Sequence, residues 1–161
     1  MAKKIKTTCH ICATVTKAEQ PLAVCPCCMT NLACPEEMLQ RQALGCLFGN
    51  VANMKVGAMG ADNGDLFLTN QRLFALAEKV TAGAAVGAAV GGLIGGAIAA
   101  AAGAENRQMA FIIPRGNIAG VEDAKIGLFG AILLHTTDGH AFKIKLPKRE
   151  IPQWKAMLMQ W

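Results

Sequence analysis

Residues 64–77, which read GDLFLTNQRLFALA, decide the fold class of this 161-residue chain. Apolar side chains dominate both halves of the stretch, and the polar pair Asn70-Gln71 separates them. This pattern is typical of two strands joined by a tight turn, so we expect a strand at 64–69 and its return at 72–77. The sequence therefore predicts an antiparallel hairpin within a mainly β fold.

Further strand signals surround this hairpin. From about residue 46 onward the pattern is β, with a first strand expected near 50–57 and later ones at 109–114, 118–121, 131–135 and 142–146. Asp138-Gly139 is a strong signal for a two-residue hairpin turn. Residues 142–146 (FKIKL) alternate apolar and lysine side chains, which predicts a strand with one buried face.

Two helices are expected at the ends of this region. Pro35, Glu36 and Glu37 suit the first turn of a helix, so residues 35–45 are predicted to form a helical linker. The chain ends in a second predicted helix, whose apolar residues recur at intervals of 3, 4 and 3: Ile151, Trp154, Leu158 and Trp161. This stripe favours a helix packed over one end of the β domain, with an interfacial membrane helix as the alternative.

Four cysteines near the N-terminus form two Cys-x-x-Cys pairs, Cys9 with Cys12 and Cys25 with Cys28. Two such pairs can place four thiolates tetrahedrally around one structural zinc ion. About thirty residues cannot build a hydrophobic core, so the metal would supply the folding energy of residues 1–34. The stretch resembles a zinc ribbon, although many ribbons carry glycine after each second cysteine, where this chain has Ala13 and Met29.

The other cysteines leave alternatives open. Cys27 and Cys34 are surplus, and either could replace one of the four ligands; Cys46 is expected to be a small core residue. A redox Cys-x-x-Cys is disfavoured because the βαβ context of that motif is missing. Seven cysteines in this pattern indicate metal binding in a reducing compartment.

The hairpin from Gly64 to Phe74 resembles the Gly-x-Leu-x-Leu-Thr-Asn-x-Arg-Leu hairpin of GRAM and bacterial pleckstrin-homology-like (PH-like) domains. Residues 113–121 are similar to the Ile-Pro-x-x-x-Ile-x-x-Val of that family, and the Thr-Thr-Asp-Gly turn and terminal helix follow in its order. The resemblance covers residues 46–161. It implies a partly open seven-strand barrel, capped by the helix, that binds lipid headgroups or proteins without catalysis.

The same resemblance limits the ligand. Phosphoinositide-binding members carry several lysines or arginines between their first two strands, whereas the loop expected here, residues 57–64, has none. A high-affinity phosphoinositide site is therefore not expected. Arg72 matches a family position, and we expect it to anchor the hairpin.

Residues 80–104 form an uncharged Ala/Gly-rich insertion. Its glycines recur every four residues at Gly83, Gly87, Gly91 and Gly95, which resembles a glycine zipper where helices pack closely. Since strands precede and follow it, we expect a helical hairpin whose arms of about 11 residues, roughly 17 Å, are too short to cross a bilayer. Such a hairpin would lie in a membrane interface, pair with copies of itself, or pack against its own barrel.

Absent residues exclude several kinds of enzyme. The chain has no serine and no tyrosine, which removes serine nucleophiles, and it has neither a phosphate-binding P-loop nor a Gly-x-Gly-x-x-Gly motif. The sequence therefore predicts a protein that is not an enzyme.

The net charge is +5, with +3 in residues 1–35 and +3 in residues 105–161. This bias is weaker than the dense basic stripe of a nucleic-acid binder, and it suits either an anionic membrane surface or a solvated face. The lysine-rich start is not followed by an apolar run, so no secretory leader is expected. We expect a cytoplasmic protein, including one peripheral to the inner face of the membrane.

These observations together predict a zinc ribbon joined to a PH/GRAM-like domain that associates with a membrane surface and forms homo-oligomers through residues 80–104. The alternative is a regulatory protein whose ribbon binds nucleic acid or a protein partner, with nucleic acid the less favoured of these.

Overall fold

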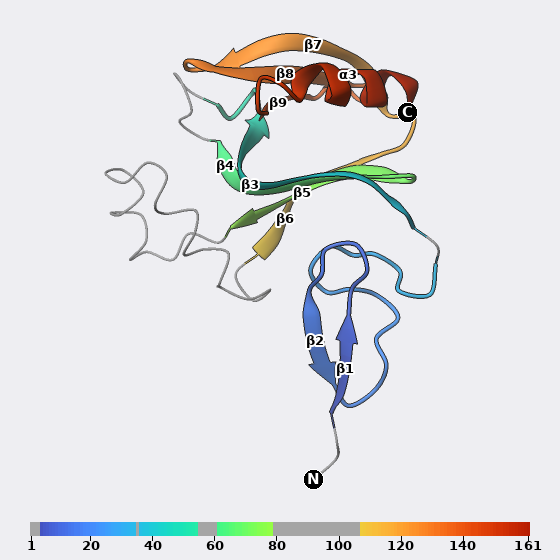
Figure 1. The fold of residues 1–161 in the computed structure, drawn as a ribbon. Coiled ribbons are helices and arrows are strands. Elements are labelled where there is room, and N and C mark those ends of the chain that lie inside the picture. The colour runs from blue at the N-terminus through green and yellow to red at the C-terminus, as the bar shows by residue number, and fades with distance from the viewer. Residues whose placement is uncertain (1–3, 35, 55–60, 79–106) are drawn as a thin grey trace, which may run out of the picture.

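The computed structural model describes residues 4–34, 36–54, 61–78 and 107–161 (Figure 1). The described chain is mainly β, as predicted. A small two-stranded sheet of β1 (Ile5–Thr8) and β2 (Val15–Ala18) comes first, and a larger antiparallel sheet follows. The predicted helical hairpin with Gly83, Gly87, Gly91 and Gly95 lies outside the described residues.

The larger sheet contains seven of the described strands: β3 (Met38–Asn50), β4 (Asp62–Thr69), β5 (Arg72–Glu78), β6 (Arg107–Pro114), β7 (Ile118–Ile126), β8 (Phe129–Thr136) and β9 (Ala141–Lys145). Their spatial order is β6-β5-β4-β3-β9-β8-β7. The edge strands β6 and β7 are joined by only three residues, 115–117, so the sheet must curl until its two edges meet at that end. Figure 1 shows the result as two layers, β3–β6 and β7–β9.

The hairpin predicted at 64–77 is confirmed, because β4 and β5 pair with Leu68 opposite Leu73. The four later strands were predicted in the right places, with ends that differ from those of β6 to β9 by a few residues: 109–114, 118–121, 131–135 and 142–146.

The helix predicted at 35–45 is wrong. Residues 38–45 belong to β3, a 13-residue strand that pairs with β4 on one side and with β9 on the other. Helix-start signals are weak local preferences, whereas residues 38–42 pair with β4 and residues 48–50 pair with β9, so tertiary pairing overrides those signals.

The first strand of the domain was also expected too late in the chain, near 50–57. Residues 51–53 form a turn, β3 ends at Asn50 and β4 begins at Asp62. Residues 57–60 of the predicted first loop lie outside the described residues, so a first loop without basic residues stays a prediction.

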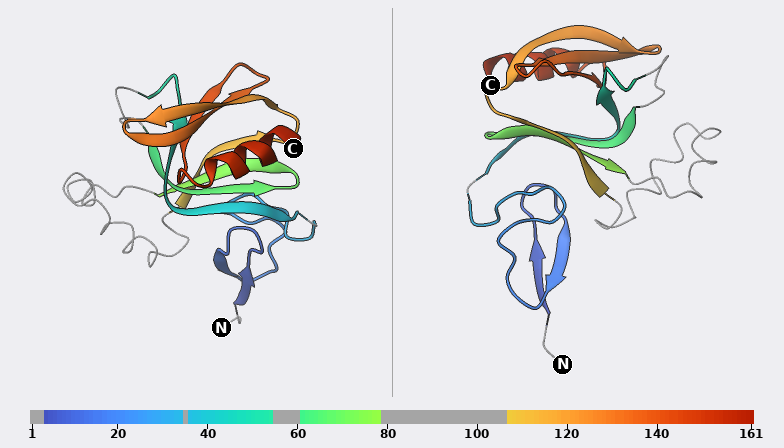
Figure 2. Two further views of the ribbon diagram at one scale, coloured as in Figure 1. Left: turned by 45° about the horizontal axis from the view of Figure 1, so that its top comes forward. Right: turned by 180° about the vertical axis from the view of Figure 1, so that it is seen from behind.

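The inside of the curled sheet is the main core, and α3 (Ile151–Gln160) covers its opening (Figure 2). Trp154 and Leu158 are buried in the same cluster as Phe48 and Phe111, whose rings meet edge to face at 5.7 Å. The packed terminal helix is therefore confirmed. In the described part of the chain, no helix is both long and apolar enough to cross a membrane.

The described residues that flank the insertion are paired with each other. Glu78, the last residue of β5, is paired with Arg107, the first residue of β6. The chain therefore leaves the sheet and re-enters it at neighbouring positions.

Candidate metal centre

Two turns of the same construction carry the four cysteines. In each turn the first cysteine accepts a backbone hydrogen bond from the residue after the second cysteine: Ala13 donates to Cys9 (3.0 Å) and Met29 donates to Cys25 (2.9 Å). Ala13 and Met29 both have left-handed backbones, with φ of 59° and 60°. These are the positions where many zinc ribbons carry glycine, so this chain adopts the turn without it.

The four thiols converge on one buried point. Cys9, Cys12, Cys25 and Cys28 are all buried, and their Sγ atoms lie within 4.8 Å of one another. Two of the separations, Cys9–Cys28 and Cys12–Cys25, are 3.7 Å. Sulfur ligands at about 2.3 Å from a tetrahedral zinc ion lie about 3.8 Å apart. The thiol set therefore fits a structural zinc ion, which would cross-link the two turns.

Two threonines support the sulfurs from outside the cluster. The Cys12 thiol donates to Thr14 Oγ1 at 3.0 Å, and Cys28 Sγ lies 3.1 Å from Thr30 Oγ1. When a metal holds the sulfur as a thiolate, a hydroxyl at this distance donates to it and fixes its orientation. Both threonines follow the second cysteine of their pair by two residues, a repeat of Cys-x-x-Cys-x-Thr that the sequence carries and that the spacing of the cysteines alone did not single out.

Burial and neighbouring thiols raise the pKa of Cys9, Cys12 and Cys28, so these three thiols hold their protons when no metal is bound. Burial raises the pKa of Cys9, and a hydrogen bond with Cys27 raises the pKa of Cys12 to about 12. A hydrogen bond with Cys12, followed by burial, raises the pKa of Cys28. Zinc must displace these protons, so its affinity should fall as the pH falls.

The surplus cysteines lie outside the cluster of four. Cys27 is half-buried, and its hydrogen bond with Cys12 lowers the pKa of Cys27 to about 7. Cys34 is also half-buried. Cys46 is buried in the sheet, where its thiol donates to the Lys145 carbonyl at 3.2 Å.

The cysteine cluster packs directly on the outer face of the sheet. Ile11 and the four cysteines form one apolar cluster with Phe67, Phe74 and Leu76 of β4 and β5. Both aromatic side chains have no exposed surface, and their rings stack at 4.9 Å. The ribbon (residues 4–34) therefore covers a sheet face that would otherwise be exposed to solvent.

A charged contact fixes the ribbon beside this apolar cluster. Glu36 is 5% exposed, and its carboxylate accepts hydrogen bonds from Arg72 Nε (2.8 Å), Arg72 Nη2 (3.1 Å) and Thr69 Oγ1 (2.8 Å). Arg72 Nη2 also donates to Thr30 Oγ1 at 2.7 Å, which ties the sheet to the second cysteine turn. Burial would raise the pKa of Glu36, but the hydrogen bonds from Arg72 and Thr69 hold it below its ordinary value.

Arg72 therefore does more than anchor its hairpin. Its guanidinium lies 4.8 Å from the centre of the Phe74 ring while it binds Glu36 and Thr30. A sequence signal for this contact exists in β4 and β5, where residues 66–68 and 73–77 are apolar without alternation. An antiparallel sheet with both faces buried needs a covering element, and here the ribbon supplies it.

Comparison with known proteins adds no family to this description. No family model matches the chain. No curated protein matches it either. The fold and the site define a mainly β protein in which a four-cysteine cluster that fits a metal ion is packed on an antiparallel sheet with a C-terminal helix.

Proposed function

We propose that this chain is a non-catalytic PH/GRAM-like module that attaches to a membrane surface and assembles with copies of itself through residues 80–104. The observation that carries the proposal is the pairing of Glu78 with Arg107. It places the residues that flank an uncharged, glycine-rich segment opposite each other in neighbouring strands of the sheet. A single straight crossing of a membrane would separate those residues, so a hairpin that dips into an interface or pairs with other hairpins fits better.

The order of the strands supports the PH-like part of the proposal. A four-strand meander and a three-strand meander meet through β3 and β9, and α3 closes the opening. The motif residues also support it, since 64–74 form the β4–β5 hairpin and 113–121 span the step from β6 to β7.

Zinc has a structural role in this proposal. The ion would hold two turns that carry little core of their own, and the folded ribbon would cover Phe67 and Phe74. We expect one zinc ion per chain by elemental analysis of protein purified under reducing conditions. Cys12→Ser should lose the metal, whereas Cys34→Ser, outside the cluster, should keep it; zinc-free wild-type protein would contradict this role.

The membrane and assembly roles are tested on the glycines. The double substitution of Gly87 and Gly91 by leucine raises both helix propensity and hydrophobicity. If close helix contact matters, the bulky side chains should reduce assembly in light scattering and reduce vesicle flotation. Unchanged or improved assembly would reject the zipper.

Nucleic-acid binding by the ribbon is the second candidate, and one observation favours it. Lys6 and Lys17 are exposed and directly opposite each other on β1 and β2. Like charges in that position repel, and an anionic backbone would relieve the repulsion. Binding of the full chain to DNA or RNA that weakens with salt, and that is lost in a Lys6→Glu, Lys17→Glu variant, would support this candidate over the first.

A further inference from the structure

The turn between β7 and β8 carries two adjacent apolar side chains into solvent. Leu128 is 99% exposed and Phe129 is 54% exposed. Gly127, with φ of +59°, makes the tight turn that places them at the tip. Single exposed apolar residues are ordinary, but a protruding apolar pair at a hairpin tip exposes surface at no gain to the fold.

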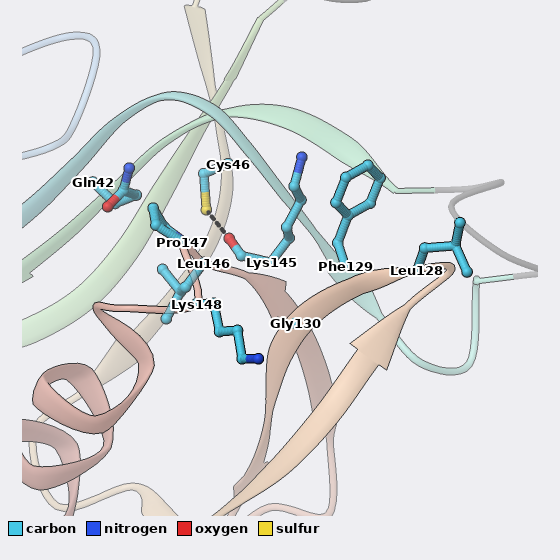
Figure 3. A pocket seen from close by; sticks show the side chains of 9 residues that line it. All are labelled: Gln42, Cys46, Leu128, Phe129, Gly130, Lys145, Leu146, Pro147 and Lys148. Carbon is cyan, nitrogen blue, oxygen red and sulfur yellow. Dashed lines mark hydrogen bonds between the residues drawn. The ribbon is translucent and has the colours of Figure 1, made fainter.

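A pocket of about 420 Å³ opens beside this tip. It lies where β3 and β9 separate, and it is lined by Gln42, Cys46, Leu128, Phe129, Gly130, Lys145, Leu146, Pro147 and Lys148. Figure 3 shows the Lys145 and Phe129 side chains projecting side by side, with Leu128 at the turn beyond them. The Lys145 ammonium lies 4.1 Å from the centre of the Phe129 ring, so a cation and an aromatic face share the rim.

The charge around the tip is positive. Lys125 and Lys148 are exposed near the tip, and Lys145 and Lys148 both line the pocket, where their side chains point in opposite directions (Figure 3). The nearest acidic groups along the chain are already in ion pairs: Asp123 with Lys155 at 3.0 Å and Glu150 with Arg149 at 3.7 Å. Three lysines near the apolar pair Leu128 and Phe129 are complementary to a membrane surface, which has anionic headgroups above an apolar layer.

The hairpin tip lies on a side of the molecule where a membrane could reach both it and the insertion. In all the views of Figures 1 and 2, the β7–β8 turn lies on the same side of the molecule as the end of β5 and the start of β6. The ribbon lies on the outer face of β4 and β5, away from that turn. One flat surface could therefore meet the tip without touching the metal centre.

We propose that residues 126–129, with Lys125, Lys145 and Lys148, form a docking site for an anionic phospholipid surface. Leu128 and Phe129 enter the interfacial layer, and the lysines bind lipid phosphate groups at the mouth of the pocket. This inference rests on the proposed function for its partner, a membrane, but it assigns the contact to residues outside the insertion.

The test is flotation of the full-length protein with phosphatidylcholine vesicles, with and without phosphatidylserine. Leu128→Asp should reduce binding to the anionic vesicles by about tenfold or more, because a fully exposed side chain can change without harming the fold while its transfer into the interface is lost. Met159→Asp is the matched control, since Met159 is 72% exposed on α3, and it should bind as wild type does.

Two charge-reversal variants complete the test. Lys148→Glu should weaken binding to anionic vesicles, and Lys4→Glu, at an exposed position on the ribbon, should leave it unchanged. Binding that is equal for wild type and Leu128→Asp would overturn the docking site while leaving the proposed membrane role intact. Wild-type binding that survives replacement of residues 81–104 by a Gly/Ser loop, and that is still lost in Leu128→Asp, would support the docking site while removing the insertion from the proposed function. No binding of wild type to either vesicle would overturn both.

Discussion

Arg72→Met should remove the charged contact between the sheet and Glu36, which directly follows the ribbon, while it keeps the aliphatic stem over Phe74. The wild-type Glu36 carboxylate accepts two hydrogen bonds from Arg72 and one from Thr69. The Glu36 side chain is buried, with 4% of its surface exposed. After the substitution its carboxylate keeps only one of those three hydrogen bonds, the one from Thr69. Removing one partner of a buried ion pair costs about 3–5 kcal/mol, so the zinc-loaded protein should lose that much stability.

A double-mutant cycle isolates the contact from other effects of the substitution. Glu36→Gln alone should cost about 1–3 kcal/mol, and the double variant should cost less than the two single variants added together by about 1–3 kcal/mol. Arg41→Met is the matched control. Arg41 also lies over a ring of the stacked pair, 5.2 Å from Phe67, but its partner Asp65 keeps a second arginine, Arg107, at 3.1 Å. The control should therefore cost less than Arg72→Met.

Urea denaturation followed by tryptophan fluorescence measures these differences, because the Trp161 indole donates to the Thr69 carbonyl at 2.8 Å, next to the contact. The pH dependence gives a second reading. Since the pKa of Glu36 is lowered in the folded protein, its contribution is present above the ordinary value of 4.5 and is lost as the pH falls through the lowered value. This loss on acidification should be absent in Glu36→Gln. A coupling energy below about 0.5 kcal/mol would refute the reasoning.

Four further substitutions test other parts of the fold by the same denaturation assay or by competition for zinc. Gly64→Ala should cost more than about 3 kcal/mol of stability, because the new Cβ would overlap the Leu76 carbonyl oxygen. Gly130→Ala is its control and should cost under about 1 kcal/mol, because the new Cβ would meet only the end of the Ile151 side chain, at 2.8 Å. Trp154→Ala should cost about 3–5 kcal/mol, since the side chain is fully buried in the core; a loss below 1 kcal/mol would show that α3 does not support the sheet. Met29→Gly should strengthen retention of zinc against a chelator, because glycine adopts a φ of 60° without the cost that a side chain adds; weaker retention would contradict the left-handed turn.

Local sequence signals predicted the parts of the fold that local chemistry controls. The Asn70-Gln71 and Asp138-Gly139 turns, the alternation in 142–146 and the stripe through Trp154 each act within a few residues, and the structure has the expected element at each place. The same holds for the cysteine cluster, because the spacing within each pair is a property of one tight turn.

The long-range contacts could not be read in this way. Residues 38–45 carry the signals of a helix start, and only their pairing with β4, and that of the rest of β3 with β9, makes them a strand. Glu36 and Arg72 are 36 positions apart, and no pattern in either segment links them before the ribbon is placed on the sheet. The one available signal was the unbroken apolar run of 73–77, which requires a cover on both faces.

If zinc holds the ribbon together, the position of Phe67 and Phe74 would make the abundance of the protein depend on the supply of zinc. Their buried outer face is covered by a module of about thirty residues, and we expect that module to be held together by one metal ion. In a zinc-starved cell the cover would open, and two stacked rings beside Arg41 and Arg72 would meet water on a sheet that is still folded. Chaperones and proteases select exposed apolar surface of this kind, so the abundance of the protein should follow the zinc status of the cell rather than the rate of its synthesis alone.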